Sequence, residues 1–236
     1  MIGTNYSIKT RKILRDVGAL VDGDHFVVSS GKHCDFFLNP ASLYIFPKKL
    51  DDISVMLTEL AITSFSDFDV ILAPAISGII LGQAVAYNLA LEINENIKFA
   101  FAEKNPFDKS RKTIRRGYEG IIKGKKVLLV DDICTTGKTL IEMAQCVISL
   151  GGVCAGAVVI CDRGQIRNLS FKQNDETYEL KIAPLVELDL QLFDQKTCPL
   201  CKAGRPLNST LGEGTDIETF RKLNQLIDQR NKECDY

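Results

Sequence analysis

The sequence lacks an excess of charge of either sign. Its 236 residues include 29 Lys or Arg and 30 Asp or Glu, which gives a net charge of -1. A general binder of nucleic acid would be strongly basic, so we expect no nucleic-acid partner and only local clusters of cations. Internal repeats, low-complexity tracts and Pro/Gly-rich linkers are also missing. One domain spanning residues 1–236, with a small cap, is the simplest organisation for this length.

The sequence also lacks an apolar run long enough to cross a membrane. A spanning helix needs about 20 mostly apolar residues, and the most apolar stretch, 70–91, is interrupted by Pro74, Gly78 and Asn88. The charged N-terminus has no apolar core of the kind found in signal peptides. We therefore expect a cytoplasmic protein without a membrane partner, and we interpret its eight cysteines as reduced thiols.

Histidine is scarce, because His25 and His33 are the only two in the chain. Cys198 and Cys201 form the one Cys-x-x-Cys pair, but structural zinc usually takes four ligands. Both histidines lie far from this pair in the sequence. We therefore favour an ordinary turn near the tail over a zinc site.

Apolar periodicity alternates between strands and helices over most of the chain. Strands are expected at 69–73, 97–102, 126–131, 153–161 and 182–188, and helices at 47–65, 79–91 and 139–150. Such alternation predicts an α/β fold, a central, mostly parallel, twisted sheet with helices on both faces. The expected subdivisions are an N-terminal helix and hood at 1–45, a core sheet at 66–190, and a C-terminal extension at 191–236 with a helix at 215–233.

The segment KVLLVDDICTTGKT, residues 126–139, carries the strongest chemical signal. A buried strand ends in Asp131 and Asp132, which we expect to lie at its solvent-facing end, and a threonine-rich loop with a glycine then enters a helix. Ligands of open α/β sheets bind at the carboxyl ends of strands, and N–H groups at a helix N-terminus can hold a phosphate. The carboxylates would repel that phosphate, so they must face another group, and the vicinal hydroxyls of a sugar fit. The motif predicts a site for a ribose 5-phosphate unit.

Two common phosphate motifs are excluded, and one plain alternative remains. A P-loop needs a glycine five residues before Gly137, where Asp132 stands, and no G-x-G-x-x-G follows an expected strand. The alternative is that the two acids merely cap a turn and the helix.

DDICTTGKT resembles the phosphoribosyl pyrophosphate motif of type I phosphoribosyltransferases. Four further stretches resemble the orotate phosphoribosyltransferases within that family. They are HFVVSSGKHCDFF (a hood), APAISGIILGQAVA (a pyrophosphate loop and helix), FAEK through RRGYEG (a catalytic loop) and CDR at 161–163 (a strand end with a base-binding arginine). The resemblance covers about residues 20–206 and implies the type I phosphoribosyltransferase fold. It also implies a pentosyl-transferring enzyme of pyrimidine biosynthesis, which moves ribose 5-phosphate from phosphoribosyl pyrophosphate to orotate with Mg²⁺ and yields orotidine 5′-monophosphate and pyrophosphate.

The resemblance also implies roles for individual residues. Phosphoribosyl pyrophosphate would be bound by Ser77, Asp131, Asp132, Ile133, Cys134, Thr135, Thr136, Gly137, Lys138 and Thr139. Orotate would be bound by Ser29, Phe37, Thr135 and Arg163, and the catalytic cations would be Lys104, Lys109, Arg111 and Lys112. No direct metal ligand is expected, although Asp131 and Asp132 could reach Mg²⁺ through water. A homodimer is implied, in which loop 103–120 reaches the neighbouring subunit's site.

Several alternatives stay open at this point. Loop 103–120 could be a solvated surface loop, although cations closing over a departing pyrophosphate would stabilise its developing charge and exclude water. Phe37 could be a core residue. The base could be a purine, since the motif would be shared. A ligand-sensing DNA-binding regulator could keep this fold without catalysis, but the short segment before the hood leaves no room for a winged helix.

Overall fold

The computed structural model describes residues 2–28, 30–108, 111–189 and 191–211. Contacts divide the chain into two compact units. The larger comprises Met1–Val17 and Pro40–Asp189, and the smaller comprises Gly18–Asn39 and Leu190–Tyr236. The N-terminal helix therefore belongs to the larger unit, whereas the hood segment belongs to the smaller unit together with the C-terminal segment. No helix in the described ranges combines the length and the apolar character that a membrane crossing requires.

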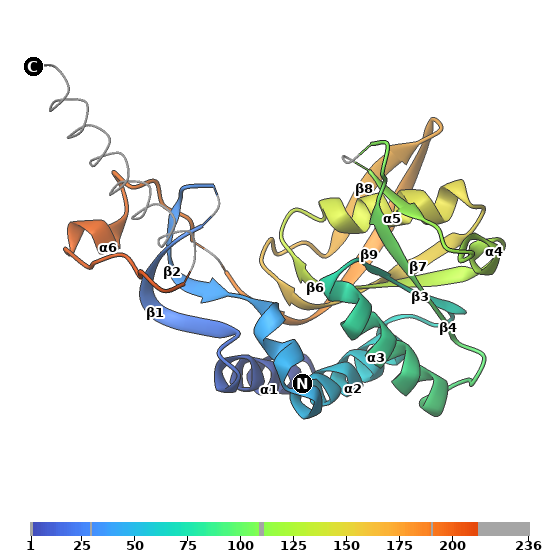
Figure 1. The fold of residues 1–236 in the computed structure, drawn as a ribbon, viewed down its shortest axis with the longest axis horizontal. Helices are drawn as coiled ribbons and strands as arrows, with labels where there is room; N and C mark the ends of the chain where they lie inside the picture. The colour runs from blue at the N-terminus through green and yellow to red at the C-terminus, as the bar shows by residue number, and fades with distance from the viewer. Residues whose placement is uncertain (1, 29, 109–110, 190, 212–236) are drawn as a thin grey trace, which may run out of the picture. The chain divides into compact units, whose positions relative to one another are not determined.

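The larger unit is built on a seven-stranded sheet of order β5-β4-β3-β6-β7-β9-β8 (Figure 1). The strands are β3 (Val70–Pro74), β4 (Lys98–Lys104), β5 (Lys112–Ile114), β6 (Lys126–Cys134), β7 (Val153–Asp162), β8 (Asn168–Gln173) and β9 (Glu176–Glu187). The five central strands are parallel, and β5 and β8 are antiparallel edges. This confirms the expected α/β fold with a mostly parallel sheet.

Helices cover both faces of the sheet, as expected. Those of the larger unit are α1 (Ile2–Asp16), the 3-10 helix η1 (Pro40–Ile45), α2 (Pro47–Ser64), α3 (Ser77–Glu92), α4 (Glu119–Ile122) and α5 (Lys138–Ser149). Side chains alternate across a strand, so Val70, Leu72, Val127 and Leu129 share one face and pack in a cluster with α5. The intervening residues of these strands are also buried, and α2 and α3 pack against this sheet as well. Parallel strands buried on both faces read as continuous apolar runs, which is why the sequence revealed them.

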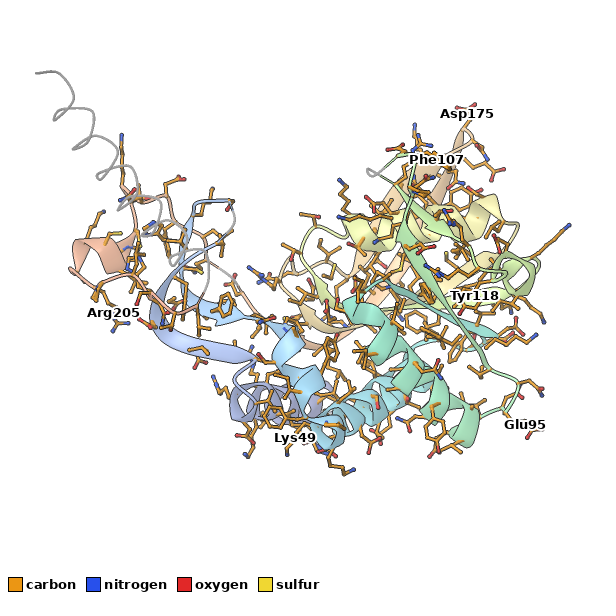
Figure 2. The ribbon with its side chains drawn as sticks, in the orientation of Figure 1. Lys49, Glu95, Phe107, Tyr118, Asp175 and Arg205 are labelled. Atoms are coloured by element: carbon orange, nitrogen blue, oxygen red, sulfur yellow. The ribbon has the colours of Figure 1, made fainter. Side chains whose placement is uncertain are left out.

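The sheet edges differ from expectation. Strands β5 and β8 were not expected, and β9 begins at Glu176 rather than at residue 182. Strands β8 and β9 form a hairpin whose turn residues, Asn174 and Asp175, both have positive φ (Asp175 is labelled in Figure 2). A type I′ turn, which suits a two-residue hairpin loop, requires a positive φ at both of its central residues.

The smaller unit contains the expected hairpin. Strands β1 (Leu20–Val27) and β2 (His33–Leu38) pair antiparallel, with an irregularity between Asp22 and Phe26. A bridge joins His33 to Phe193 in the C-terminal segment, which also holds the short helix α6 (Pro199–Lys202). The helix expected at 215–233 lies outside the described residues.

Candidate active site

Strand β6 carries the two acids of the motif to the carboxyl edge of the sheet. Asp131 accepts a hydrogen bond from the backbone N–H of Asp132 at 2.9 Å, and Asp132 accepts one from the N–H of Ile133 at 2.7 Å. We expected both acids at a solvent-facing strand end, which is wrong for Asp131, because only 5% of it is exposed. The strand continues to Cys134 rather than ending at residue 131, so Asp131 stays inside the sheet.

Burial governs the protonation of Asp131. Desolvation, with the neighbouring charge of Asp132 as a second cause, raises the pKa of Asp131 to about 8. The Tyr44 hydroxyl donates to Oδ2 of Asp132 at 3.3 Å, and burial raises the pKa of Tyr44 as well. Tyr44 was missed by the sequence reasoning, because no motif surrounds it and 88 residues separate it from Asp132.

The raised pKa of Asp131 predicts a pH-dependent stability. Between its ordinary pKa of 3.8 and about 8, the folded protein holds a proton that the unfolded chain releases. The free energy of unfolding should therefore fall as pH rises through this window and level off above it. Thermal unfolding of wild type and Asp131→Asn should show a pH slope in wild type that the variant lacks. Parallel slopes from about pH 5 to about pH 9 would contradict this account.

The loop after the acids encloses a pocket of about 120 Å³. It is lined by Asp131, Ile133, Cys134, Thr135, Thr136, Gly137, Lys138, Thr139 and Leu140. Gly137 has φ +73° and precedes the first residue of α5, whose N-terminal N–H groups favour an anion. A Cβ on Gly137 would lie 2.4 Å from Cδ1 of Leu169, so a side chain here would displace a buried neighbour. The lining thus includes eight of the ten residues expected to bind the phosphorylated sugar, and Asp132 and Ser77 are the two outside it.

Arg163 lies beside this loop. Its backbone N–H donates to the carbonyl of Cys134 at 2.8 Å, which ties the turn after β7 to the motif. A Cβ on Gly164 would come within 2.1 Å of the carbonyl oxygen of Thr135, so the two turns are in close contact. Nε of Arg163 is buried and has no hydrogen-bond partner among the described residues. Two of the residues expected to bind the base, Thr135 and Arg163, are therefore neighbours at the edge of the pocket.

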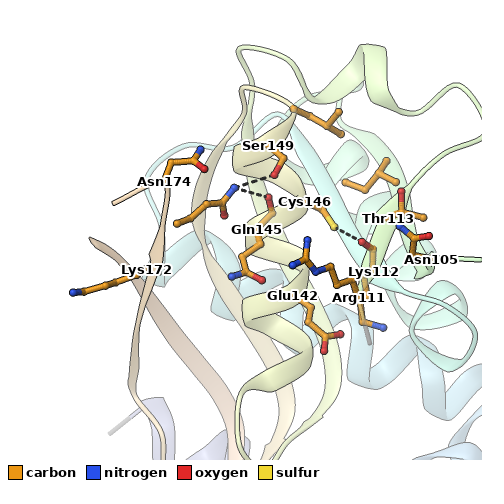
Figure 3. Close-up of a pocket in the computed structure, with 13 residues that line it drawn as sticks. Asn105, Arg111, Lys112, Thr113, Glu142, Gln145, Cys146, Ser149, Lys172 and Asn174 are labelled. Carbon is orange, nitrogen blue, oxygen red and sulfur yellow. Dashed lines mark hydrogen bonds between the residues drawn. The ribbon is translucent and has the colours of Figure 1, made fainter. Parts of the chain in front are cut away.

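The cations of the basic loop lie elsewhere. Lys104 and Lys112 are paired across the antiparallel ladder of β4 and β5. Arg111 and Lys112 line a second cavity of about 470 Å³, with residues of α5 and β8, rather than the motif pocket (Figure 3). There the thiol of Cys146 donates to the carbonyl of Lys112 at 3.1 Å.

Other cations of this loop form ion pairs. Arg115 and Arg116 lie 3.6 and 3.0 Å from Glu103, and Arg111 lies 3.4 Å from Asp108. Lys104 and Lys112 make no ion pair within the described residues. Among the described lysines of the loop, Lys104 and Lys112 therefore keep a charge that no ion pair neutralises, and the charge of Lys112 acts on Asp131, where it lowers the pKa against the effect of burial.

Of the remaining expected residues, those that the structure describes do not line the motif pocket, although Ser77 follows the carboxyl end of β3, the parallel neighbour of β6. Ser77 is the exposed first residue of α3, three residues after β3. Phe37 belongs to β2 of the smaller unit, where its half-buried ring lies 5.7 Å from that of Phe26, which fits the core alternative. Ser29 and Lys109 lie outside the described residues.

Comparison with known proteins shows the class of enzyme to which the chain belongs. Residues 47–181 match the family model described as a phosphoribosyl transferase domain, which places the chain among the phosphoribosyltransferases. An orotate phosphoribosyltransferase from Campylobacter jejuni subsp. doylei is 35% identical over 198 residues, which is 82% of this chain and 93% of that protein. One from Caldanaerobacter subterraneus subsp. tengcongensis is 35% identical over 80% of this chain and 88% of its own length.

A crystal structure of the Francisella tularensis orotate phosphoribosyltransferase shares the fold. It has a TM-score of 0.55 and 21% identity, and the match covers 89% of this chain and 96% of that one. Given the identities of the two curated relatives, the chain belongs to the orotate phosphoribosyltransferase family.

Proposed function

We propose that this protein transfers ribose 5-phosphate from phosphoribosyl pyrophosphate to orotate, giving orotidine 5′-monophosphate and pyrophosphate in pyrimidine nucleotide biosynthesis. The proposal rests on one arrangement at the carboxyl end of β6. Asp131 lines a pocket of the size of a phosphate group, Asp132 is next to it, and Arg163 lies beside the same loop. Membership of the family supports the choice of substrates, because the related proteins are named for orotate.

The motif would hold the sugar phosphate in a fixed position. Backbone N–H groups at the start of α5 and the hydroxyls of Thr135, Thr136 and Thr139 donate to the phosphate. Asp131 and Asp132 accept hydrogen bonds from the ribose hydroxyls. Because the loop is tied to β7 through Arg163 and Cys134, binding requires little ordering of the backbone. The chain thus contributes alignment more than covalent chemistry.

Orotate is an anion, and Arg163 would face its carboxylate. Arg163 as a whole is half-buried, and a hydrogen bond between its guanidinium and the carboxylate would be stronger than one between neutral groups. The ring nitrogen of the base attacks the ribose carbon as pyrophosphate departs from the opposite face, and the proton of that nitrogen passes to solvent or to the departing pyrophosphate. No enzyme nucleophile and little general-base catalysis are required.

The acid pair also suits Mg²⁺. This ion prefers oxygen ligands, and it is usually held by one or two carboxylates, substrate phosphates and several waters. Asp131 lines the phosphate pocket and Asp132 adjoins it, so both could reach the ion through water. When bound, the ion would neutralise charge on the departing pyrophosphate.

The loop lysines are proposed to act on the leaving group. Replacing Lys104 or Lys112 with alanine should lower kcat at least about tenfold while changing the KM for phosphoribosyl pyrophosphate by less than about threefold, because the charge they stabilise develops in the transition state. Steady-state kinetics would measure both constants. Lys98→Ala is the matched control, since Lys98 begins the same strand, β4, at its opposite end. A lysine whose replacement leaves kcat unchanged is only a surface charge.

The proposal extends to the assembly and the location of the protein. In a homodimer, loop 103–120 would reach the neighbouring subunit's site, which would give its lysines access to a pyrophosphate outside their own cavity. A cytoplasmic location is supported by the absence of disulfide bonds among the seven cysteines in the described ranges.

The substrate proposal is tested by mixing the enzyme, Mg²⁺, phosphoribosyl pyrophosphate and orotate and following the fall in orotate absorbance. Parallel reactions with adenine and hypoxanthine show whether the base is a purine. Turnover of orotate alone supports the proposal. Unchanged orotate absorbance, with either purine consumed instead, would refute it.

A further inference from the structure

Four metal-binding side chains of the smaller unit converge on one point. His25 comes from β1, His33 from β2, and Cys198 and Cys201 from the segment that begins α6. One ligand atom from each lies within 4.8 Å of the other three. Three of these residues are buried and Cys201 is half-buried. The two histidines are the only ones in the chain, so this cluster uses both of them.

Three nitrogen–sulfur separations lie close to the edge length of a coordination tetrahedron. Sγ of Cys198 and Sγ of Cys201 lie 3.6 and 3.7 Å from Nε2 of His25, and Sγ of Cys201 lies 3.3 Å from Nδ1 of His33. With Zn–N near 2.0–2.1 Å and Zn–S near 2.3 Å, the N···S edge of a tetrahedron is about 3.6 Å. The two nitrogens are 2.8 Å apart, and they would separate by roughly 0.5 Å around an ion.

A supporting hydrogen bond orients His25. Its Nδ1 lies 2.8 Å from the carbonyl oxygen of Arg205, which can only accept. Nδ1 therefore carries the proton, and Nε2 presents its lone pair to the cluster. Metal-bound histidines almost always donate their other N–H in this way. A simple hydrogen bond between the two imidazoles would account for the 2.8 Å contact, but not for the two sulfur atoms at tetrahedral distances from them.

We propose that His25, His33, Cys198 and Cys201 hold one structural zinc ion. Two nitrogen and two sulfur ligands in tetrahedral array favour zinc, and a set of four protein ligands leaves no open position for catalysis. We favoured an ordinary turn for the Cys-x-x-Cys pair because the histidines are distant in sequence. The folded chain instead brings His25 and Cys198 together across 173 residues.

The small core of this unit explains why an ion would be useful there. Its buried apolar residues are few, namely Ala19, Leu20, Phe26, Val27, Cys34 and Cys198 among those described. Very small units usually need disulfides or metals because burial alone stabilises them too little. An ion joining the β1–β2 hairpin to the C-terminal segment would supply that stability, since the ligands are not assembled in the unfolded chain.

The test begins with the metal content of the full-length wild-type protein, purified without chelators. Mass spectrometry should find about one zinc per chain, and X-ray absorption should show two N and two S ligands at about 2.0–2.1 and 2.3 Å. After removal of the metal by a chelator, titration with Co²⁺ should give the visible absorption of a tetrahedral thiolate site. Protease cleavage within 18–39 and 191–211 should increase when the metal is removed.

Variants then locate the ion. Cys198→Ser with Cys201→Ser should lose at least about nine-tenths of the zinc, whereas Cys154→Ser, a half-buried cysteine of β7, should keep about one per chain. If the double variant fails to fold, the wild-type measurements alone decide. Wild-type protein without zinc that also fails to take up Zn²⁺ or Co²⁺ would overturn the proposal. So would a ligand shell without sulfur, or full zinc content in a folded double variant.

Discussion

Replacing both acids of the motif, Asp131→Asn with Asp132→Asn, is expected to lower kcat/KM by about a thousandfold or more. The Asp132 carboxylate can accept hydrogen bonds from two ribose hydroxyls, and its replacement loses two charge-assisted bonds worth about 1.5–3 kcal/mol apiece, or roughly ten- to 150-fold each. Steady-state assays with orotate and phosphoribosyl pyrophosphate measure this loss.

The fold should survive this double change. Burial raises the pKa of Asp131 to about 8, so the carboxyl is mostly protonated near neutral pH and an amide is close to it in shape and charge. The amide oxygens can still accept the hydrogen bonds that the backbone N–H groups of Asp132 and Ile133 donate. Circular dichroism should therefore resemble wild type, and near neutral pH the variant should unfold at a temperature no lower than wild type, because asparagine releases no proton on unfolding.

Asp67→Asn is the matched control for the acid pair. Asp67 is an exposed acid that pairs with Lys126 at the opposite, amino end of β6, at 2.6 Å. Its replacement should leave kcat/KM within about twofold, because an exposed ion pair contributes little. A double variant that folds and retains most of its activity would show that the acids only cap a turn.

The second large effect is expected for Gly137→Ala. A Cβ would meet the side chain of Leu169 at 2.4 Å, and the φ of +73° disfavours any side chain by about 1–2 kcal/mol. The loop must move to relieve the steric clash with Leu169 and the backbone strain. A shift of about 1 Å in a positioning loop can cost about a hundredfold in rate. Isothermal calorimetry with phosphoribosyl pyrophosphate and steady-state kinetics would record the loss of binding and activity.

Gly124→Ala separates the effect of backbone strain from the effect of a steric clash. Gly124 has a similar φ of +70°, but nothing lies within 4 Å of the added Cβ. It should lose about 1–2 kcal/mol of stability through the backbone strain alone and keep normal kcat/KM. Equal activity in the two variants would show that the close approach of Leu169 to Gly137 does not shape the phosphate pocket.

The interior strands could be predicted because they are buried on both faces. Val127–Val130 form a continuous apolar run, and its short length between flanking turn residues favours a strand over a helix. The edge strands β5 and β8 were missed for the opposite reason. β5 is short, and β8 is half-exposed with only Leu169 and Phe171 buried. The adjacent Asn174–Asp175 pair was the available hairpin signal.

The composition of the motif pocket could also be predicted, since its residues are contiguous in sequence. Contacts between segments that are distant in sequence could not be predicted. The hydrogen bond from Tyr44 to Asp132 and the proximity of His25 to Cys198 are set by tertiary packing. The burial of Asp131 was misjudged because it depends on how far β6 continues beside β7, where Asp131 pairs with Val159.

The register of the β4–β5 ladder limits how far the basic loop can extend. Lys104 faces Lys112, so only seven residues connect them. A chain that leaves and returns can project at most half its contour length, about 12 Å here. In a dimer, the recipient site would have to lie within that radius plus the length of one side chain from the donor's sheet edge, or the β4–β5 ladder would have to open to lengthen the loop.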